Sequence, residues 1–112
     1  MVCYAEPIKL TASWYSEASL KQDGQWAITK GRCADGSIFK DTNYSAASWD
    51  FPLKTKLRVT TVKAPKKSII VENTDRTARR FKGKRCDLSK RAFSEIANLE
   101  QGLVEVYVEV VK

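Results

Sequence analysis

The sequence predicts a mainly β protein, a small closed or nearly closed barrel of about six short strands with one helix in its C-terminal half. Two observations lead to this prediction. Several short segments alternate apolar and polar residues, which is typical of strands with one face in a core. One segment, residues 88–99, instead repeats apolar residues at helical spacing. With 112 residues, the chain can form one domain with a modest core.

In the N-terminal half, the sequence predicts two main strands, residues 8–15 and 44–49, separated by a long loop. Residues 8–15 alternate and form the first strand. Residues 16–32 are polar, so we expect a loop there, with a short strand at 26–28. The Asp35-Gly36 pair marks a turn. The small residues of 44–49 fit a short strand that packs closely against its neighbours.

The C-terminal half predicts a hairpin and a final strand. Residues 56–63 and 68–72 form the two hairpin strands, joined by a turn at 64–67. The uninterrupted apolar run in 68–72 indicates burial on both faces of the sheet. Residues 104–110 alternate strictly, with four valines on one side, which places that side in the core.

The helix is predicted from an apolar stripe that extends across residues 88–99. The stripe consists of Leu88, Ala92, Ile96 and Leu99, widened by Phe93. Asp87 or Ser89 can cap its N-terminus by accepting a hydrogen bond from an otherwise unpaired backbone N–H.

The charge balance favours anionic partners. The formal net charge is +7, and a basic surface attracts nucleic acid, anionic cell-wall polymers and membrane headgroups alike. The densest basic cluster is Arg76, Arg79, Arg80, Lys82, Lys84 and Arg85. It is either a ligand surface or a solvated loop. No apolar run reaches the ~20 residues that a membrane span needs.

Histidine and cysteine usage excludes several kinds of site. The chain has no histidine, which excludes Ser/His/Asp and Cys/His catalysis and any His-ligated zinc. Cys3, Cys33 and Cys86 lack CxxC spacing, so we expect no metal site and no cofactor. Cys33 and Cys86 either form one disulfide in an exported protein or remain two buried thiols.

The first nine residues have two interpretations. Residues 3–5 are small enough for a signal peptidase to cut after them, but a basic region and an apolar core are missing. Residues 1–9 are therefore either the remnant of a signal peptide or a native start. We expect the folded domain to cover residues 10–112.

Seven short motifs follow one another along the chain. They are Ala12-Ser13-Trp14-Tyr15, Ala34-Asp35-Gly36-Ser37, Ser45-Ala46-Ala47-Ser48, Phe51-Pro52-Leu53-Lys54-Thr55, Leu57-Arg58-Val59-Thr60, Thr74-Asp75-Arg76 and Cys86-Asp87-Leu88-Ser89. In this order they resemble the RlpA-like (rare lipoprotein A) domain, a cell-wall glycan module. The resemblance implies a six-stranded double-psi β-barrel. Expansins share that barrel and similar Trp-Tyr and Asp-Leu-Ser signatures, so they are the second relatives.

The resemblance also implies a polar groove that binds peptidoglycan or a related polysaccharide. Family members that cleave glycan use Glu, His and Asp. Here Ser37 stands at the Glu position, Ser48 at the His position, and Asp75 keeps the Asp. The serine hydroxyls are suited to hydrogen bonding with sugar but not to acid catalysis at neutral pH. The implied location is secreted, periplasmic or in the cell envelope.

Four further residues complete the predicted substrate site. Tyr15 matches a groove position, and Trp49 is next to Ser48, so both are expected to stack on sugar rings. Trp14 alternates with Tyr15 and is expected in the core. Arg76 follows Asp75, and Asp87 is either a groove residue or the helix cap.

The catalytic hypothesis gives Asp75 the central role. Ordinary glycoside hydrolysis needs two carboxylates. A lytic transglycosylase needs one acid, because the C6 hydroxyl of muramic acid attacks the anomeric carbon and yields a 1,6-anhydro product. That acid requires a raised pKa, from burial or from a neighbouring acid such as Asp87. Arg76, Arg79 and Arg80 would lower the pKa if they faced Asp75.

Three functions follow from these observations. The first is lytic transglycosylase action on peptidoglycan. The second is a non-catalytic, expansin-like role in binding or loosening the wall, favoured by the loss of the Glu and His equivalents. The third and least expected is nucleic-acid binding, which depends on charge alone and predicts affinity that falls steeply with salt. We expect a monomer in each case.

Overall fold

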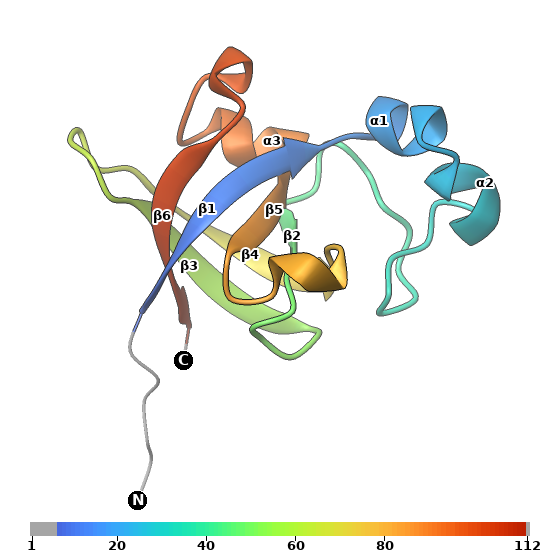
Figure 1. Cartoon of the computed structure of the whole chain (residues 1–112), viewed down its shortest axis with the longest axis horizontal. Coiled ribbons are helices and arrows are strands. Elements are labelled where there is room, and N and C mark those ends of the chain that lie inside the picture. The colour runs from blue at the N-terminus through green and yellow to red at the C-terminus, as the bar shows by residue number, and fades with distance from the viewer. Residues whose placement is uncertain (1–6, 112) are drawn as a thin grey trace, which may run out of the picture.

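The computed structural model describes residues 7–111, and its strands close into one barrel (Figure 1). Around the barrel the strands follow the order β1-β5-β2-β4-β3-β6. Their bounds are β1 Ile8–Tyr15, β2 Ser45–Ala47, β3 Thr55–Thr61, β4 Ser68–Asp75, β5 Arg85–Ser89 and β6 Val104–Val110. The predicted six-stranded, mainly β barrel is confirmed. The proposals for Met1 and Cys3 lie outside the described residues.

The barrel mixes parallel and antiparallel pairs. β1 pairs with β5, and β2 with β4, in parallel. The other neighbours are antiparallel, including the β3–β4 hairpin and the β1–β6 pair that closes the barrel. Segments distant in the sequence therefore lie side by side, as β1 and β5 do (Figure 1).

The core confirms the alternation expected of the clearest strands. Val59 of β3 pairs with Val108 of β6, and both are fully buried, as are Leu57 and Val106 on the same two strands. Trp14 packs against this core, as expected, and its indole N–H donates to the carbonyl of Leu99 at 3.0 Å. Burial of such side chains supplies most of the stabilisation of a domain this small.

The helix predicted over residues 88–99 is wrong in extent. Leu88 belongs to β5, where it pairs with Trp14 on one side and Ala46 on the other. The helix α3 covers only Lys90–Ser94, and Leu99 lies in the 3₁₀ helix η2, Leu99–Gln101. The apolar residues recur at helical spacing because they are buried against the barrel, not because they share one continuous helix. Ser89 caps α3 by accepting from Ala92 N–H at 3.3 Å, so the alternative with Asp87 as the cap is wrong.

Residues 16–32 form two short helices rather than a loop with a strand at 26–28. They are α1, Glu17–Gln22, and α2, Gln25–Thr29. A reciprocal capping box between Ser16 and Ser19 starts α1, because each side chain accepts from the other residue's backbone N–H. Residues 7–111 thus contain three short α-helices where one was predicted, and β5 is the strand that the sequence prediction missed.

Strand β4 is buried on one face rather than two. Ile70 is 48% exposed, whereas Val71 is 1% exposed. In the antiparallel hairpin with β3, alternate residues face the solvent, and an apolar residue there is tolerated. None of the helices in the described part of the chain is long and apolar enough to cross a membrane.

Both cysteines within the described residues, Cys33 and Cys86, are buried free thiols. This agrees with the second of the two alternatives drawn from the sequence. Cys86 belongs to β5 and the core, where burial raises the pKa of its thiol to about 12. Cys33 lies in the loop that precedes the turn at Asp35 and Gly36.

Candidate functional site

Two aspartates lie on one row that crosses four neighbouring strands of the barrel. Ser13 of β1 pairs with Asp87 of β5, Asp87 with Ala47 of β2, and Ala47 with Asp75 of β4. Paired residues point to the same side of a sheet. Their neighbours Ala12, Leu88 and Ala46 face the core, so this row faces outward. Two strand spacings separate the Cα atoms of Asp75 and Asp87, roughly 10 Å.

A β-bulge turns Asp75 outward. Ala46 pairs with Asn73, but Ala47 pairs with Asp75, so Thr74 is an extra residue in β4. In a regular strand, residues 73 and 75 would share one face. Here Asn73 remains fully buried, and its amide donates to the carbonyl of Phe51 at 2.8 Å. The extra residue therefore separates a structural amide from the candidate acid.

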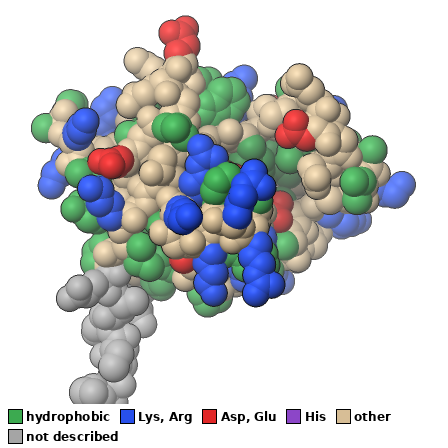
Figure 2. All heavy atoms as spheres, in the orientation of Figure 1, with side chains coloured by type: hydrophobic (Ala, Val, Ile, Leu, Met, Phe, Trp, Pro, Cys, Tyr) green, Lys and Arg blue, Asp and Glu red, His purple; other side chains and the backbone are tan. Residues whose placement is uncertain are grey.

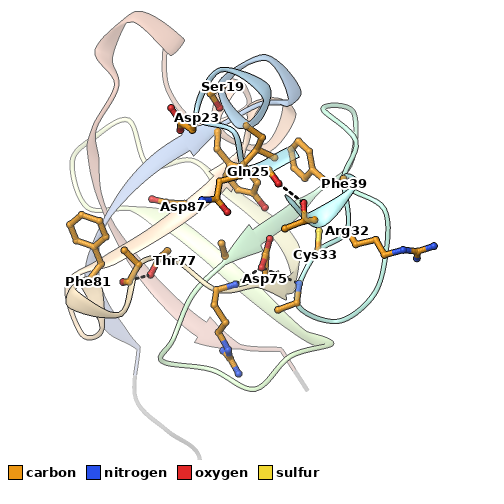
Figure 3. A pocket seen from close by; sticks show the side chains of 18 of the residues that line it. Ser19, Asp23, Gln25, Arg32, Cys33, Phe39, Asp75, Thr77, Phe81 and Asp87 are labelled. Carbon is orange, nitrogen blue, oxygen red and sulfur yellow. Dashed lines mark hydrogen bonds between the residues drawn. The ribbon is translucent and has the colours of Figure 1, made fainter. Parts of the chain in front are cut away.

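Three residues of the row, Asp87, Ala47 and Asp75, form the floor of a cleft of about 810 Å³. Helices α1 and α2 and the loop after them form one wall. The segment that carries the 3₁₀ helix η1, Arg79–Phe81, forms the other. In Figure 3, the side chains of Asp75 and Asp87 lie between Phe81 on one side and Cys33 on the other.

The carboxyl group of Asp75 is half-buried and held by the backbone. Its Oδ1 accepts from Ala34 N–H at 3.0 Å and from Arg76 N–H at 2.8 Å. Burial raises its pKa above the ordinary aspartate value, and the nearby Asp35 adds to that rise. The two backbone hydrogen bonds and the charge of Arg76 oppose it without cancelling it. The sequence hypothesis gave the role of neighbouring acid to Asp87; the structure gives it to Asp35.

Asp87 is more deeply placed than Asp75. The hydroxyl of Ser13 donates to its Oδ1. Burial raises the pKa of Asp87, while the Ser13 hydrogen bond and the charge of Arg85 lower it. Asp87 thus faces the cleft from a strand, with a partner that holds its carboxylate in place.

Arg76 reaches past Asp75 to the end of β2. Its Nη1 donates to the carbonyls of Ser48 and Phe51, at 2.5 and 2.6 Å. Its guanidinium lies over the Trp49 ring, 5.2 Å from the centroid. Because these contacts direct the charge toward the carbonyls, the charge of Arg76 lowers the pKa of Asp75 less than the Arg76 backbone N–H does.

The structure brings four of the predicted site residues together and leaves three elsewhere. Tyr15, Asp75, Arg76 and Asp87 line the cleft, whereas Ser37, Ser48 and Trp49 lie outside it. Ser37 is exposed, and its hydroxyl donates to Asp35 at 2.5 Å. Ser48 is fully buried, and its Oγ accepts from Asp50 N–H at 3.1 Å. The indole N–H of Trp49 donates to the carbonyl of Thr77 at 2.6 Å.

A family model described as lytic transglycolase matches residues 8–108. The chain belongs to this family. It is an RlpA-like, expansin-like double-psi β-barrel of the lytic transglycosylase type, as the sequence motifs implied. No curated protein matches its sequence.

Solved structures share the fold of this lytic transglycosylase-type barrel at low sequence identity. Streptomyces papain inhibitor has a TM-score of 0.71 and 18% identity over 100% of both chains. An Asp-to-Asn mutant of Clavibacter michiganensis expansin in complex with cellohexaose has a TM-score of 0.64 and 19% identity. The apo expansin has a TM-score of 0.64 and 21% identity. Each expansin match covers 95% of this chain and 50% of the expansin, so this chain spans half the expansin length.

Tyr15 links the floor of this lytic transglycosylase-type barrel to its wall. Its ring stacks on Phe39, with ring centroids 4.6 Å apart and an interplanar angle of 28°. Its hydroxyl is buried and has no hydrogen-bond partner within residues 7–111. Burial raises the pKa of this phenol well above its ordinary value. The hydroxyl of Ser45 opposes this rise, and the phenol oxygen is buried rather than open to the cleft.

Sequence reasoning missed several residues of the site. Asp35, whose charge acts on Asp75, was seen only as part of a turn, and Cys33, which lines the cleft, only as a disulfide partner or a buried thiol. Phe39 and Phe81 were not considered, although both line the cleft. Nothing in the local sequence indicated Phe39.

Proposed function

We propose that this chain is a cell-wall glycan module that binds a peptidoglycan-like polysaccharide in the cleft, with Asp75 as its central acid. The observation that carries the proposal is the bulge that turns a half-buried carboxyl with a raised pKa onto the cleft floor. Family membership supports it. Because the polymer lies outside the cytoplasm, we place the protein in the cell envelope or outside the cell, as a monomer.

In the enzymatic form of the proposal, Asp75 acts as the single acid. Its protonated carboxyl donates to the glycosidic oxygen as the bond to the anomeric carbon breaks. The C6 hydroxyl of the muramic acid then attacks that carbon and returns its proton to Asp75. Between these steps the carboxylate is stabilised by the N–H groups of Ala34 and Arg76, which already point at Oδ1.

A second candidate, binding without cleavage, is favoured by a different observation. The serines at the Glu and His positions, Ser37 and Ser48, lie outside the cleft. Asp87 is held by Ser13 and is roughly 10 Å from Asp75 between Cα atoms, so no close carboxylate pair is preformed. An expansin of this fold has been captured with cellohexaose, which supports a cleft suited to extended glycans.

Incubation with peptidoglycan sacculi separates the two candidates. Intact sacculi and sacculi stripped of peptides are incubated with the protein, and mass spectrometry examines the soluble fraction. Anhydromuramyl products that disappear in Asp75→Asn support the enzyme. Sedimentation with the sacculi without products supports the binding module. If neither occurs, peptidoglycan is not the ligand and the proposal is wrong.

A further inference from the structure

The densest charge on the molecule lies beside the cleft, in residues 76–85, called here the basic segment. Its cations are Arg76, Arg79, Arg80, Lys82, Lys84 and Arg85. Figure 2 shows Lys and Arg side chains gathered over this part of the surface, around hydrophobic atoms. Three ion pairs occur in the described part of the chain, and none involves the basic segment.

Three acids lie near the basic segment without forming an ion pair with it. Asp50 accepts the backbone N–H of Gly83 at 3.0 Å. Asp75 is close enough to Arg76, and Asp87 to Arg85, for each arginine charge to lower the pKa of its neighbouring carboxyl. Six cations against three acids leave a surplus of positive charge at one end of the cleft.

Four arginines of the segment are ordered by two aromatic rings. The distances from guanidinium carbon to ring centroid are 5.2 Å for Arg76 and 5.9 Å for Arg79 over Trp49, and 4.6 Å for Arg80 and 4.7 Å for Arg85 over Phe81. A guanidinium held over a ring face can still bind a carboxylate through its N–H groups. Arg76 already donates to the carbonyls of Ser48 and Phe51, so Arg79, Arg80 and Arg85 are the arginines that can bind a ligand in this way. Such ordering lowers the entropy cost of binding, which a freely solvated loop would not do.

The basic segment is continuous with the cleft. Arg80 and Phe81 line the same cleft as Asp75 and Asp87. A polymer that crosses the carboxylate row therefore continues over the stacked arginines. The floor is acidic and the adjoining wall is basic, so the two parts select different portions of one ligand.

We propose that the basic segment is an anion-binding subsite that makes carboxylate-bearing glycans the preferred ligands of the cleft. The inference rests on the proposed function, because it assumes that a glycan lies over Asp75. A glycan can place spaced carboxylates on the arginines while neutral sugar rings pass over the aspartates. A nucleic acid fits less well, since duplex DNA carries one charge per ~1.7 Å and would bring phosphates close to the acidic floor.

The test compares two hexasaccharides by titration calorimetry at low and at raised salt. Hexagalacturonate carries a carboxylate on each sugar, and cellohexaose carries none. We expect the wild-type chain to prefer hexagalacturonate roughly tenfold or more at low salt, with the preference shrinking as salt rises. A short DNA duplex is titrated in parallel.

Two charge-matched variants locate the effect. The first combines Arg79→Gln, Arg80→Gln and Lys82→Gln in the basic segment. The control combines Lys63→Gln, Lys66→Gln and Lys67→Gln near the turn between β3 and β4, at the other end of β4. All six side chains are exposed, and thermal unfolding verifies that both variants fold. We expect the first variant to bind both hexasaccharides equally and the control to keep most of the preference.

The outcomes separate the inference from the proposed function. Equal binding of the two hexasaccharides by the wild-type chain overturns the inference and leaves glycan binding standing. A preference that survives in the first variant, or that falls equally in the control, also overturns it. Tighter binding of DNA assigns the segment to nucleic acid instead. If neither hexasaccharide binds, the subsite is rejected, and the sacculus experiment decides the proposed function independently.

Discussion

Asp75 and Asp87 lie on the same outward row of the barrel, separated only by strand β2. They differ in what holds them: two backbone N–H groups for Asp75, and the hydroxyl of Ser13 for Asp87. Burial raises the pKa of both. The two carboxyls are therefore independent acids on one floor, and each can be tested separately.

Asp75→Asn is expected to abolish cleavage without harming the fold. If Asp75 is the acid, glycan cleavage should fall by about 10²- to 10⁴-fold, because an amide cannot donate the required proton. The amide oxygen can still accept from Ala34 and Arg76, so unfolding by urea should show no loss of stability at neutral pH. A large loss of stability would make Asp75 a structural residue.

The same variant tests the raised pKa of Asp75. The folded protein holds this proton more tightly than the unfolded chain does, so the ionised group destabilises the fold. Between the folded pKa and the ordinary aspartate value, the stability of the wild type relative to Asp75→Asn should increase as the pH falls. Urea unfolding of both proteins from neutral to acidic pH measures the difference. A relative stability that decreases on acidification in this window contradicts the raised pKa.

Ser13→Ala is expected to destabilise the protein in a pH-dependent way. The hydroxyl of Ser13 donates to ionised Asp87, and loss of a hydrogen bond to a charged group costs about 1.5–3 kcal/mol. This bond lowers the pKa of Asp87, so its contribution is present at neutral pH and decreases as Asp87 is protonated. Urea unfolding at neutral and acidic pH measures both values. An equal loss at both would mean that the hydroxyl does not bind the charged form preferentially.

Ser89→Ala is expected to cost more than an ordinary helix cap. The Oγ of Ser89 accepts from Ala92 N–H and Ser45 N–H, and it donates to the carbonyl of Asn43. Removal of this fully buried hydroxyl should lower the free energy of unfolding by about 2 kcal/mol. Ser94→Ala is the control, because its hydroxyl bonds only an exposed carbonyl. Similar effects of the two changes on urea unfolding would contradict the assigned role.

Tyr15→Phe is expected to separate binding from stability. The buried hydroxyl lacks a partner in residues 7–111, so its removal should leave the melting temperature unchanged or raise it. If glycan binding moves the surrounding side chains so that the sugar bonds this hydroxyl, the variant should bind about five- to tenfold more weakly, corresponding to about 1 kcal/mol. Calorimetry and thermal unfolding measure the two effects. A lower melting temperature with unchanged affinity would assign Tyr15 to the fold.

The sequence predicted the parts of this fold that repeat a pattern over several residues. In β1 and β6, apolar and polar residues alternate along most of the strand, and the structure has both strands. β5 escaped prediction because only Cys86 and Leu88 face the core before α3 begins, and that spacing also fits a helix. Helices α1 and α2 contain no buried residue, so no apolar pattern marked them.

Prediction of the site depended on what is local in the chain. Asp75 was found because the residues of its motif, Thr74-Asp75-Arg76, are adjacent in the sequence. The structure places Asp75 on the cleft floor. The bulge at Thr74 was not predictable, because it exists only in the pairing of β4 with β2. The influence of Asp35 on Asp75 likewise depends on a loop that returns from forty residues earlier, where Ala34 N–H reaches the carboxyl.

The closure of the barrel limits how any long polymer can be recognised. Each strand within residues 7–111 has a neighbour on both sides, so the barrel has no edge strand. A bound chain cannot join the sheet as an additional strand. Selectivity must then come from outward side chains and from the loops above them. These positions tolerate substitution far better than the sheet does, so relatives with this barrel can change ligand while the framework is retained.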